Sequence, residues 1–267
     1  MSTTLPISTQ SERQPELRDI VWVDNVTRMF GPVTALQDVS MRLTEGEVTA
    51  LVGDNGAGKS TLVKMISGVL PPSVGTIQFD GADMVFGNPA QAREAGIETV
   101  YQDLALAGNM PVWANIFLGR ELVRGPLRLL DKKAMAERAR EMLAQFNMNV
   151  PPINGTVDAL SGGQRQLIAI ARAAAWGSRL IIMDEPTAAL GVAETRAVES
   201  VIQTLKARGF SVLIISHNLD QVFRLSDRIW VLRRGSMVGE RRTASTHANE
   251  IVSLITGAAA TASEGRP

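Results

Sequence analysis

One segment, residues 53–61, constrains the fold of this chain more than any other. Its sequence, GDNGAGKST, satisfies the pattern G-x-x-x-x-G-K-[ST]. The apolar run Val48–Val52 precedes it and predicts a buried strand, while a helix is predicted to begin within it. Glycines let successive backbone N–H groups curl around an anion, and the helix N-terminus adds about half a positive charge. The segment is therefore predicted to be a phosphate-binding loop between a strand and a helix.

The side chains of this loop have different expected roles. Lys59 should reach the β- and γ-phosphates of a nucleoside triphosphate, and the Ser60 hydroxyl should ligate Mg²⁺. A glycine-rich turn that binds nothing is the alternative, but the coincidence of strand, loop and helix argues against it. The candidate phosphate-binding residues are Gly53, Asp54, Asn55, Gly56, Ala57, Gly58, Lys59, Ser60 and Thr61.

A second apolar run, residues 180–183, delivers Asp184 and Glu185 to the end of another predicted strand. Ligands of open α/β sheets bind at the carboxyl ends of the strands. Asp184 is expected to belong to the Mg²⁺ shell and Glu185 to polarise an attacking water, because phosphoryl transfer depends on positioning and charge neutralisation. A surface acidic pair after a strand is the alternative, and the phosphate-binding loop makes the functional interpretation stronger.

Three further residues could complete a site at this edge, although each has a structural alternative. His217 follows the predicted strand at 211–215 and could donate a hydrogen bond to the γ-phosphate. Gln102 follows the predicted strand Ile97–Val100, at the entry to the helical lobe, and could ligate Mg²⁺ without adding charge. Phe30 could stack on adenine. Taken alone, they would be a structural histidine, an exposed loop residue and a core aromatic.

The order of predicted elements indicates an α/β domain at residues 19–256. Buried strands at 48–52, 180–183 and 212–215 are each followed by a helical segment, which is typical of a parallel sheet. Residues 88–176 are mainly helical, with Asn88 and Asp131 as predicted helix N-caps, and should form an inserted lobe. Residues 1–18 and 257–267 have little apolar content and are expected to be disordered tails.

Composition excludes several classes of protein. Lys+Arg and Asp+Glu both number 27, so there is no basic surplus for a dedicated nucleic-acid binder. The absence of cysteine removes disulfides, thiolate zinc sites and a cysteine nucleophile. No apolar run approaches the roughly 20 residues that span a bilayer, and the N-terminus lacks an export signal. A cytoplasmic protein is expected.

The segment Leu160, Ser161, Gly162, Gly163 and Gln164, which reads LSGGQ, resembles the signature of ABC ATPases. The resemblance covers about residues 20–256, because the other motifs occur in the family's order: Phe30 at the adenine-stacking position, residues 53–61 as Walker A, Gln102 as the Q-loop, Asp184 and Glu185 in Walker B, and His217 as the switch histidine. It implies a P-loop NTPase fold with a RecA-like core sheet, an N-terminal antiparallel β portion and an inserted helical subdomain. It also implies ATP and Mg²⁺ as cofactors.

The same resemblance implies partners. Ser161 should cap a helix whose N-terminus closes over the γ-phosphate held by a second copy of the chain, so that two ATP molecules lie between two subunits. Two integral-membrane permease subunits and, indirectly, a solute-binding protein would complete a transporter, with this subunit at the cytoplasmic face of the inner membrane. The stretch at residues 114–121, ANIFLGRE, is similar to monosaccharide importers of the fructose or ribose type.

One departure and two alternatives remain. Gly191 stands where most ABC ATPases carry an aspartate that contacts the opposite subunit, which questions the coupling between the two ATP sites. A soluble ABC ATPase of translation or DNA repair is one alternative, but this chain has a single ATPase domain and no basic arm or long coiled-coil insert. A non-hydrolysing scaffold is the other, and it predicts a damaged Glu185 or His217, both of which are present.

Overall fold

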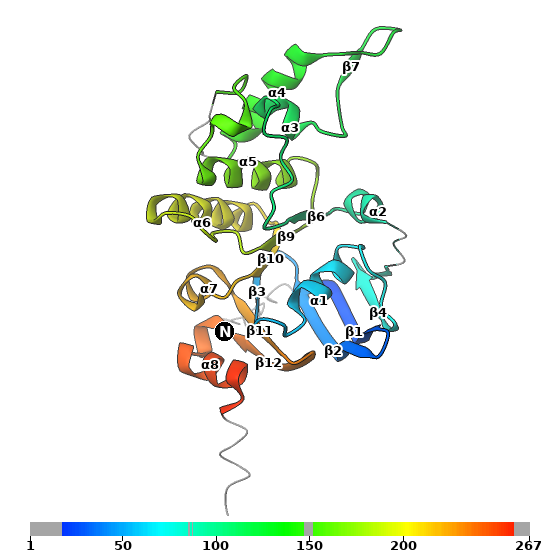
Figure 1. Cartoon of the computed structure of the whole chain (residues 1–267), viewed down its shortest axis with the longest axis vertical. Helices are drawn as coiled ribbons and strands as arrows, with labels where there is room; N and C mark the ends of the chain where they lie inside the picture. The colour runs from blue at the N-terminus through cyan, green and yellow to red at the C-terminus, as the bar shows by residue number, and fades with distance from the viewer. Residues whose placement is uncertain (1–17, 85, 87, 147–151, 259–267) are drawn as a thin grey trace, which may run out of the picture.

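A six-stranded sheet forms the centre of the computed structural model, which describes residues 18–84, 86, 88–146 and 152–258 (Figure 1). The strand order is β12-β11-β3-β10-β9-β6. Five strands run parallel, and β12 pairs antiparallel with β11 at the edge. The strands are β3 (Val48–Val52), β6 (Ile97–Val100), β9 (Leu180–Asp184), β10 (Ser211–Ile215), β11 (Arg228–Arg233) and β12 (Ser236–Arg242). The predicted α/β core is confirmed.

A second sheet precedes and packs beside the first. It is antiparallel, in the order β2-β1-β4-β5, with β1 (Asp19–Phe30), β2 (Val33–Thr44), β4 (Val74–Phe79) and β5 (Ala82–Asp83). Its inner face and that of the parallel sheet bury aliphatic residues of α1 (Lys59–Ile66) between them. The expected N-terminal antiparallel portion is therefore present, and it holds α1 in place.

The helices flank the parallel sheet or form a separate lobe beside it. Those with the sheet are α2 (Pro89–Glu94), α6 (Val192–Ala207), α7 (Leu219–Leu225) and α8 (Ala248–Thr256). The lobe lies at the end of the molecule opposite α8 (Figure 1). It contains α3 (Val112–Ile116), α4 (Lys132–Ala144), the 3₁₀ turn η1 (Val157–Ala159), α5 (Gly162–Ala174) and a hairpin of β7 (Val123–Arg124) and β8 (Leu129–Leu130). A second 3₁₀ turn, η2 (Thr243–Ser245), follows β12.

The entry to the helical lobe differs from the expected residue 88. Asn88 does cap α2, its Oδ1 accepting hydrogen bonds from Ala90 and Gln91, and Asp131 likewise caps α4. However, β6 pairs in parallel with β9, so the chain returns to the sheet at Ile97–Val100 before it enters the lobe. The sequence marks residues 97–100, but their partner β9 follows the whole lobe in the chain, so local pattern could not place them in the sheet. The expected tails fall almost wholly at residues 1–17 and 259–267, outside the described residues.

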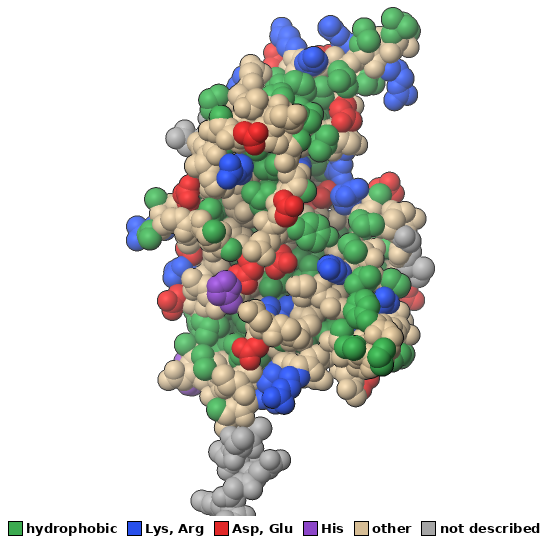
Figure 2. Space-filling model, in the orientation of Figure 1, with side chains coloured by type: hydrophobic (Ala, Val, Ile, Leu, Met, Phe, Trp, Pro, Cys, Tyr) green, Lys and Arg blue, Asp and Glu red, His purple; other side chains and the backbone are tan. Residues whose placement is uncertain are grey.

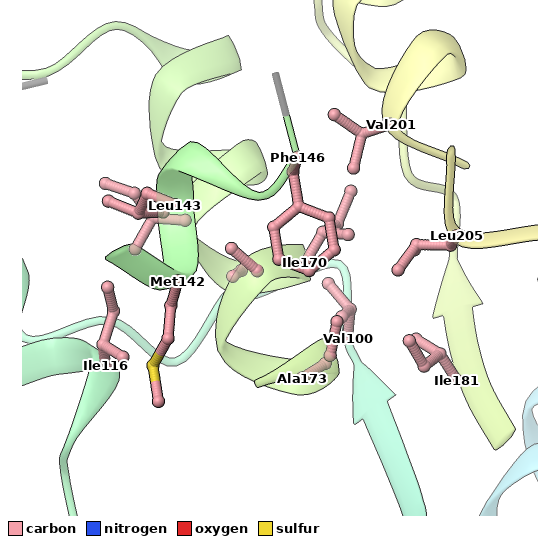
Figure 3. Packing of buried hydrophobic residues seen from close by; sticks show 14 of the residues in the cluster. Val100, Ile116, Met142, Leu143, Phe146, Ile170, Ala173, Ile181, Val201 and Leu205 are labelled. Carbon is pink, nitrogen blue, oxygen red and sulfur yellow. The ribbon is translucent and has the colours of Figure 1, made fainter. Parts of the chain in front are cut away.

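One apolar core joins the lobe to the sheet. Phe146, after α4, packs among Ile170 of α5 and Val201 and Leu205 of α6 (Figure 3). Phe117 is fully buried and meets Trp176 edge to face, with ring centroids 5.2 Å apart. Burying side chains of this size stabilises the fold by about 1.5–3 kcal/mol each. Within the described residues, no helix combines the length and apolar character needed to cross a bilayer.

Candidate functional site

The predicted site residues converge on one cleft at the carboxyl ends of β3, β9 and β10. The cleft has a volume of about 1070 Å³. All nine residues of the phosphate-binding loop line it, together with Gln102, Asp184, Glu185 and His217. Acidic, basic and histidine side chains gather near the middle of this face of the molecule (Figure 2). The expectation that these segments share one edge of the sheet agrees with this arrangement.

The backbone of the loop leaves no room for side chains at two glycines. Gly53 has φ 153°, and a Cβ there would overlap the Leu232 carbonyl oxygen of β11. Gly58 has φ 106°, and a Cβ there would lie 2.9 Å from the Ala35 carbonyl oxygen. The Gly235 N–H donates to the Ala57 carbonyl over 2.9 Å, tying the loop to the β11–β12 turn. The loop is thus fixed by strands that are distant in sequence. Helix α1 begins within it, and the first N–H groups of a helix have no partner inside the helix.

Lys59 folds back on its own loop. Its Nζ donates to the Gly53 carbonyl at 2.6 Å and to the Asp54 carbonyl at 2.9 Å. Partial burial lowers the pKa of Lys59, while the nearby carboxylates of Glu185 and Asp184 oppose this effect. The ammonium therefore lies between the loop and the acidic pair, where an anion that enters the cleft would meet it.

Asp184 and Glu185 differ in environment although they are adjacent. Burial, followed by the charge of Glu185, raises the pKa of Asp184. Glu185 Oε1 lies 2.8 Å from Nδ1 of His217, which itself is largely exposed. Glu185 also adopts φ 51°, a left-handed conformation that costs energy for a residue with a side chain and is concentrated at functional sites. The pair thus offers one partly buried carboxylate and one held by a histidine.

A buried polar link behind this pair was not found from the sequence. The Ser216 hydroxyl donates to Oε1 of Gln221 at 3.0 Å, and Nε2 of Gln221 donates to the Thr187 hydroxyl at 2.8 Å. Ser216 and Gln221 are each 1% exposed. The link connects the strand end that carries His217 with the loop after Glu185. Only their closeness in sequence to His217 could have indicated these two residues, because a serine after a strand and a glutamine in a helix carry no distinctive signal.

Gln102 lines the cleft, whereas Phe30 lies outside its lining. Gln102 is exposed and lines the cleft. Phe30 ends β1 with 46% of its surface exposed, does not line the cleft and lies under the Arg28 guanidinium, 4.8 Å from the ring centroid. Val33, Thr34 and Ala35 of β2 line this side of the cleft instead. Sequence reasoning missed these three residues because no motif marks them.

The LSGGQ segment lies away from the cleft, at the N-terminus of α5. Ser161 caps the helix, its hydroxyl accepting from the Gln164 N–H at 3.3 Å, and Oε1 of Gln164 accepts from the Ser161 N–H at 3.0 Å. The predicted cap is therefore confirmed. None of Leu160, Ser161, Gly162, Gly163 or Gln164 lines the cleft. A group bound in this chain's own cleft does not touch them.

The donor set of the cleft suits a nucleoside triphosphate with Mg²⁺. Among the described residues there is no cluster of three or more His, Cys, Asp or Glu side chains that would hold a metal by itself. Mg²⁺ commonly takes one or two protein oxygens and completes its shell with phosphates and water. The Ser60 hydroxyl, the Gln102 amide and the Asp184 carboxylate could supply such oxygens. The glycine cradle and Lys59 fit the phosphates.

Comparison with known proteins agrees with this geometry. Residues 36–188 match the ABC transporter family model. The chain is 45% identical to the xylose/arabinose import ATP-binding protein XylG of Sulfolobus acidocaldarius, over 90% of this chain and 95% of the relative. It is 44% identical to the fructose import ATP-binding protein FrcA of Rhizobium meliloti, over 90% and 94%.

Solved structures show the same fold. A nucleotide-free ATP-binding cassette from an ABC transporter superposes with a TM-score of 0.77 at 29% identity, covering 90% of this chain and 96% of that one. The dimeric structure of a bacterial ABC transporter cassette superposes with a TM-score of 0.71 at 26% identity, covering 84% and 98%. The chain therefore belongs to the ABC transporter family and is a nucleotide-binding cassette of it.

Proposed function

We propose that this chain is the ATP-binding and ATP-hydrolysing subunit of an ABC importer that energises the uptake of a monosaccharide. The observation that carries the proposal is the single cleft that holds the phosphate-binding loop, Lys59, Asp184 and the Glu185–His217 pair. Relatives that match over nearly their whole length are import ATP-binding proteins for xylose/arabinose and for fructose. Because their sugars differ, the proposal is a monosaccharide, with pentoses and fructose as the first candidates.

In the proposed reaction, the residues of the cleft bind, orient and move a proton. The amides of residues 53–61 and the Lys59 ammonium bind the β- and γ-phosphates. Phe30 ends β1 outside the lining of the cleft and would stack on an adenine that extends past Val33. Ser60, Asp184 and Gln102 would hold Mg²⁺, which would neutralise charge on the phosphates. Glu185 accepts a proton from the attacking water, and His217 orients Glu185 and donates to the γ-phosphate.

The unit that hydrolyses ATP is a homodimer. Ser161 and the amide of Gly163 lie outside their own cleft, so a second copy must supply these donors to each ATP. The dimeric structure of a similar cassette supports this arrangement. Bound ATP makes contacts that stabilise the closed dimer, and hydrolysis removes them. Hydrolysis therefore shifts the equilibrium from the closed dimer toward separated subunits. One chain is therefore half of each active site.

The dimer works through membrane partners. Two permease subunits dock on the helical lobe at the cytoplasmic face of the cell membrane, and a solute-binding protein delivers the sugar on the other side. The exposed Leu118, in the stretch that is similar to monosaccharide importers, is a candidate permease contact. The intact Glu185–His217 pair argues against a scaffold that binds ATP without hydrolysing it.

The test has two parts. Purified protein should release phosphate from ATP in the presence of Mg²⁺ and not with EDTA. Cells lacking the gene should then lose uptake of one radiolabelled sugar among xylose, arabinose, fructose and ribose, and regain it with the wild-type chain. Turnover without any uptake defect would contradict the importer, and absence of turnover in a folded, dimeric protein would contradict the ATPase.

A further inference from the structure

The N-terminus of α5 carries an internal anion. Glu194, in the first turn of α6, reaches back to the LSGGQ segment, where its Oε1 accepts a hydrogen bond from the Gly163 N–H at 3.3 Å. The Ser161 side chain lies close enough to the same carboxylate to lower its pKa. Its Oε2 accepts from the Gly191 N–H at 3.2 Å. One carboxylate thus joins the starts of two helices that pack side by side (Figure 1).

This contact is close and specific. A Cβ at Gly163 would lie 2.7 Å from Cβ and Cγ of Glu194, so glycine is required there to let the side chain pass. The positive ends of two helices face the carboxylate, which favours its charged form. These hydrogen bonds lower the pKa of Glu194, so that the group is anionic at neutral pH.

Capping of α6 explains only part of the geometry. A carboxylate at the third helical position commonly accepts from the N-cap N–H, as Oε2 of Glu194 does here. The second oxygen, Oε1, is not needed for that cap, yet it accepts a hydrogen bond from Gly163, which lies 31 residues earlier in the chain at the start of another helix. Glu194 therefore occupies the Gly163 amide and lies beside the Ser161 hydroxyl, and these are the donors that the proposed dimer offers to the partner's γ-phosphate.

We propose that Glu194 is a positioning residue that holds the Ser161 and Gly163 donors in place before ATP arrives and must release them when the γ-phosphate bound to the second subunit docks. The inference rests on the proposed dimer and deepens it. A carboxylate and a phosphate cannot share two donors, because like charges a few ångströms apart repel strongly in a site that excludes water. Glu194 consequently sets the ATP concentration at which the dimer closes.

The experiment measures ATP-dependent dimerisation in a chain that cannot hydrolyse ATP. The Glu185→Gln protein is titrated with MgATP, and the dimer fraction is followed by light scattering after size exclusion. Adding Glu194→Gln removes the charge while keeping a polar side chain. We expect the ATP concentration for half-maximal dimer to fall about tenfold, while binding of a fluorescent ATP analogue to the monomer changes less than about twofold.

The matched control is Glu199→Gln in the same background. Glu199 lies on α6 five residues later and pairs with Arg224, away from the LSGGQ segment. Glu199→Gln removes the same charge from the same helix but does not affect the LSGGQ segment, so this variant should leave the ATP requirement unchanged. Should Glu194→Gln lower the melting temperature substantially, Glu194→Asp is used instead, because the shorter carboxylate keeps the cap and loses reach toward Gly163; it should also lower the ATP requirement.

The outcomes separate the two proposals. An ATP requirement that is unchanged or higher in the folded Glu194 variants would overturn this inference and leave Glu194 as a helix cap alone. An equal decrease in the Glu199→Gln control would also overturn it, because the cause would then be general charge. If the Glu185→Gln parent forms no dimer at any ATP concentration, the proposed homodimer itself fails.

Discussion

In the proposed dimer two helix N-termini of each chain meet phosphate, and they differ in what lies beside them. At α1, the loop of residues 53–61 opens into a large cleft, and the charged side chain beside it is a lysine that bonds only to loop carbonyls. At α5, Gly163 already bonds to the carboxylate of Glu194, and the Ser161 hydroxyl lies beside that carboxylate. The first site has its cation ready, whereas the second has an anion in place.

This difference explains why one subunit can bind nucleotide by itself, whereas closure of the dimer over that nucleotide needs a further step. A cleft with a cation lowers the cost of bringing in a polyanion, so binding precedes any partner. The N-terminus of α5 already holds the Glu194 carboxylate, so it does not attract a second anion until a γ-phosphate displaces that carboxylate. Closure then depends on a γ-phosphate displacing Glu194, which gives a sharper dependence on ATP than either site would have alone. The predictions below test each side of this comparison.

Removing the cation at the first site should have the largest effect. Lys59→Ala leaves backbone amides alone to neutralise the β- and γ-phosphates, so phosphate release should fall by about 10³-fold or more. Lys64→Ala is the matched control, since Lys64 is exposed in the last turn of the same helix and should retain activity. Steady-state phosphate release measures both. Turnover of Lys59→Ala close to wild type would show that the cleft is not the ATPase site.

Removing the proposed base should have the next largest effect. Glu185→Gln keeps size and hydrogen bonding but cannot accept a proton, so hydrolysis should slow by about a hundredfold or more while ATP still binds. The trapped ATP should then hold two subunits together, as seen by size exclusion with MgATP. A variant that hydrolyses slowly and stays monomeric at saturating ATP would break the proposed link between the two helix N-termini.

How far the sequence could predict this arrangement depends on the range of the interactions. The loop of residues 53–61, the Ser161 cap and the strands before Asp184 and His217 follow local rules of pattern, turn and capping, and these expectations agree with the structure. The Glu185–His217 contact could only be expected as a shared edge, because its 2.8 Å separation depends on how β9 and β10 register.

Other features depend on contacts between segments that are distant in sequence. Glu194 reaches Gly163 across 31 residues, and Gly53 fits only because the Leu232 carbonyl of β11 lies against it. No local pattern carries such information. Phe30 was assigned to adenine from the family order of motifs alone, whereas the cleft wall on that side is formed by residues after the turn, beginning at Val33.

Asp184, at the first site, should lower the stability of the fold in its ionised form although the proposed ATPase reaction needs that form. The pKa of Asp184 is raised in the folded protein, so its ionisation opposes folding as pH rises from the usual value of 3.8 through the raised one. Without Mg²⁺, Asp184→Asn should therefore raise the melting temperature at pH 7.5, by on the order of 2 °C. The difference should shrink as the pH falls to about 3.8 and below, where Asp184 becomes protonated in both the folded and the unfolded state. A melting temperature that falls at pH 7.5 would contradict this account, and MgATP turnover should fall in any case.

The smallest expected effect concerns the second site. Gly191 is the N-cap of α6 with φ −68° and ψ 166°, an extended conformation open to any residue, and a Cβ there would meet only Oε2 of Glu194, at 3.9 Å. Aspartate at an N-cap exceeds glycine by only a few tenths of a kcal/mol, so Gly191→Asp should move the melting temperature by about 1 °C or less. Its charge should nevertheless repel Glu194 and loosen the hold on Ser161 and Gly163. It should also restore the carboxylate that most ABC ATPases direct toward the opposite subunit.

The weaker hold of Glu194 should soften the dependence on ATP slightly, whereas the restored carboxylate should couple the two ATP sites. We expect the second effect to be the larger, so Gly191→Asp should raise the Hill coefficient for ATP in steady-state hydrolysis. Gly191→Asn is the matched control, because asparagine caps the helix equally well without adding charge. It should leave the Hill coefficient near that of the wild type. A Hill coefficient and maximal rate that stay within error of wild type in a stable Gly191→Asp protein would mean that the glycine is a neutral substitution and that the added carboxylate does not couple the two ATP sites.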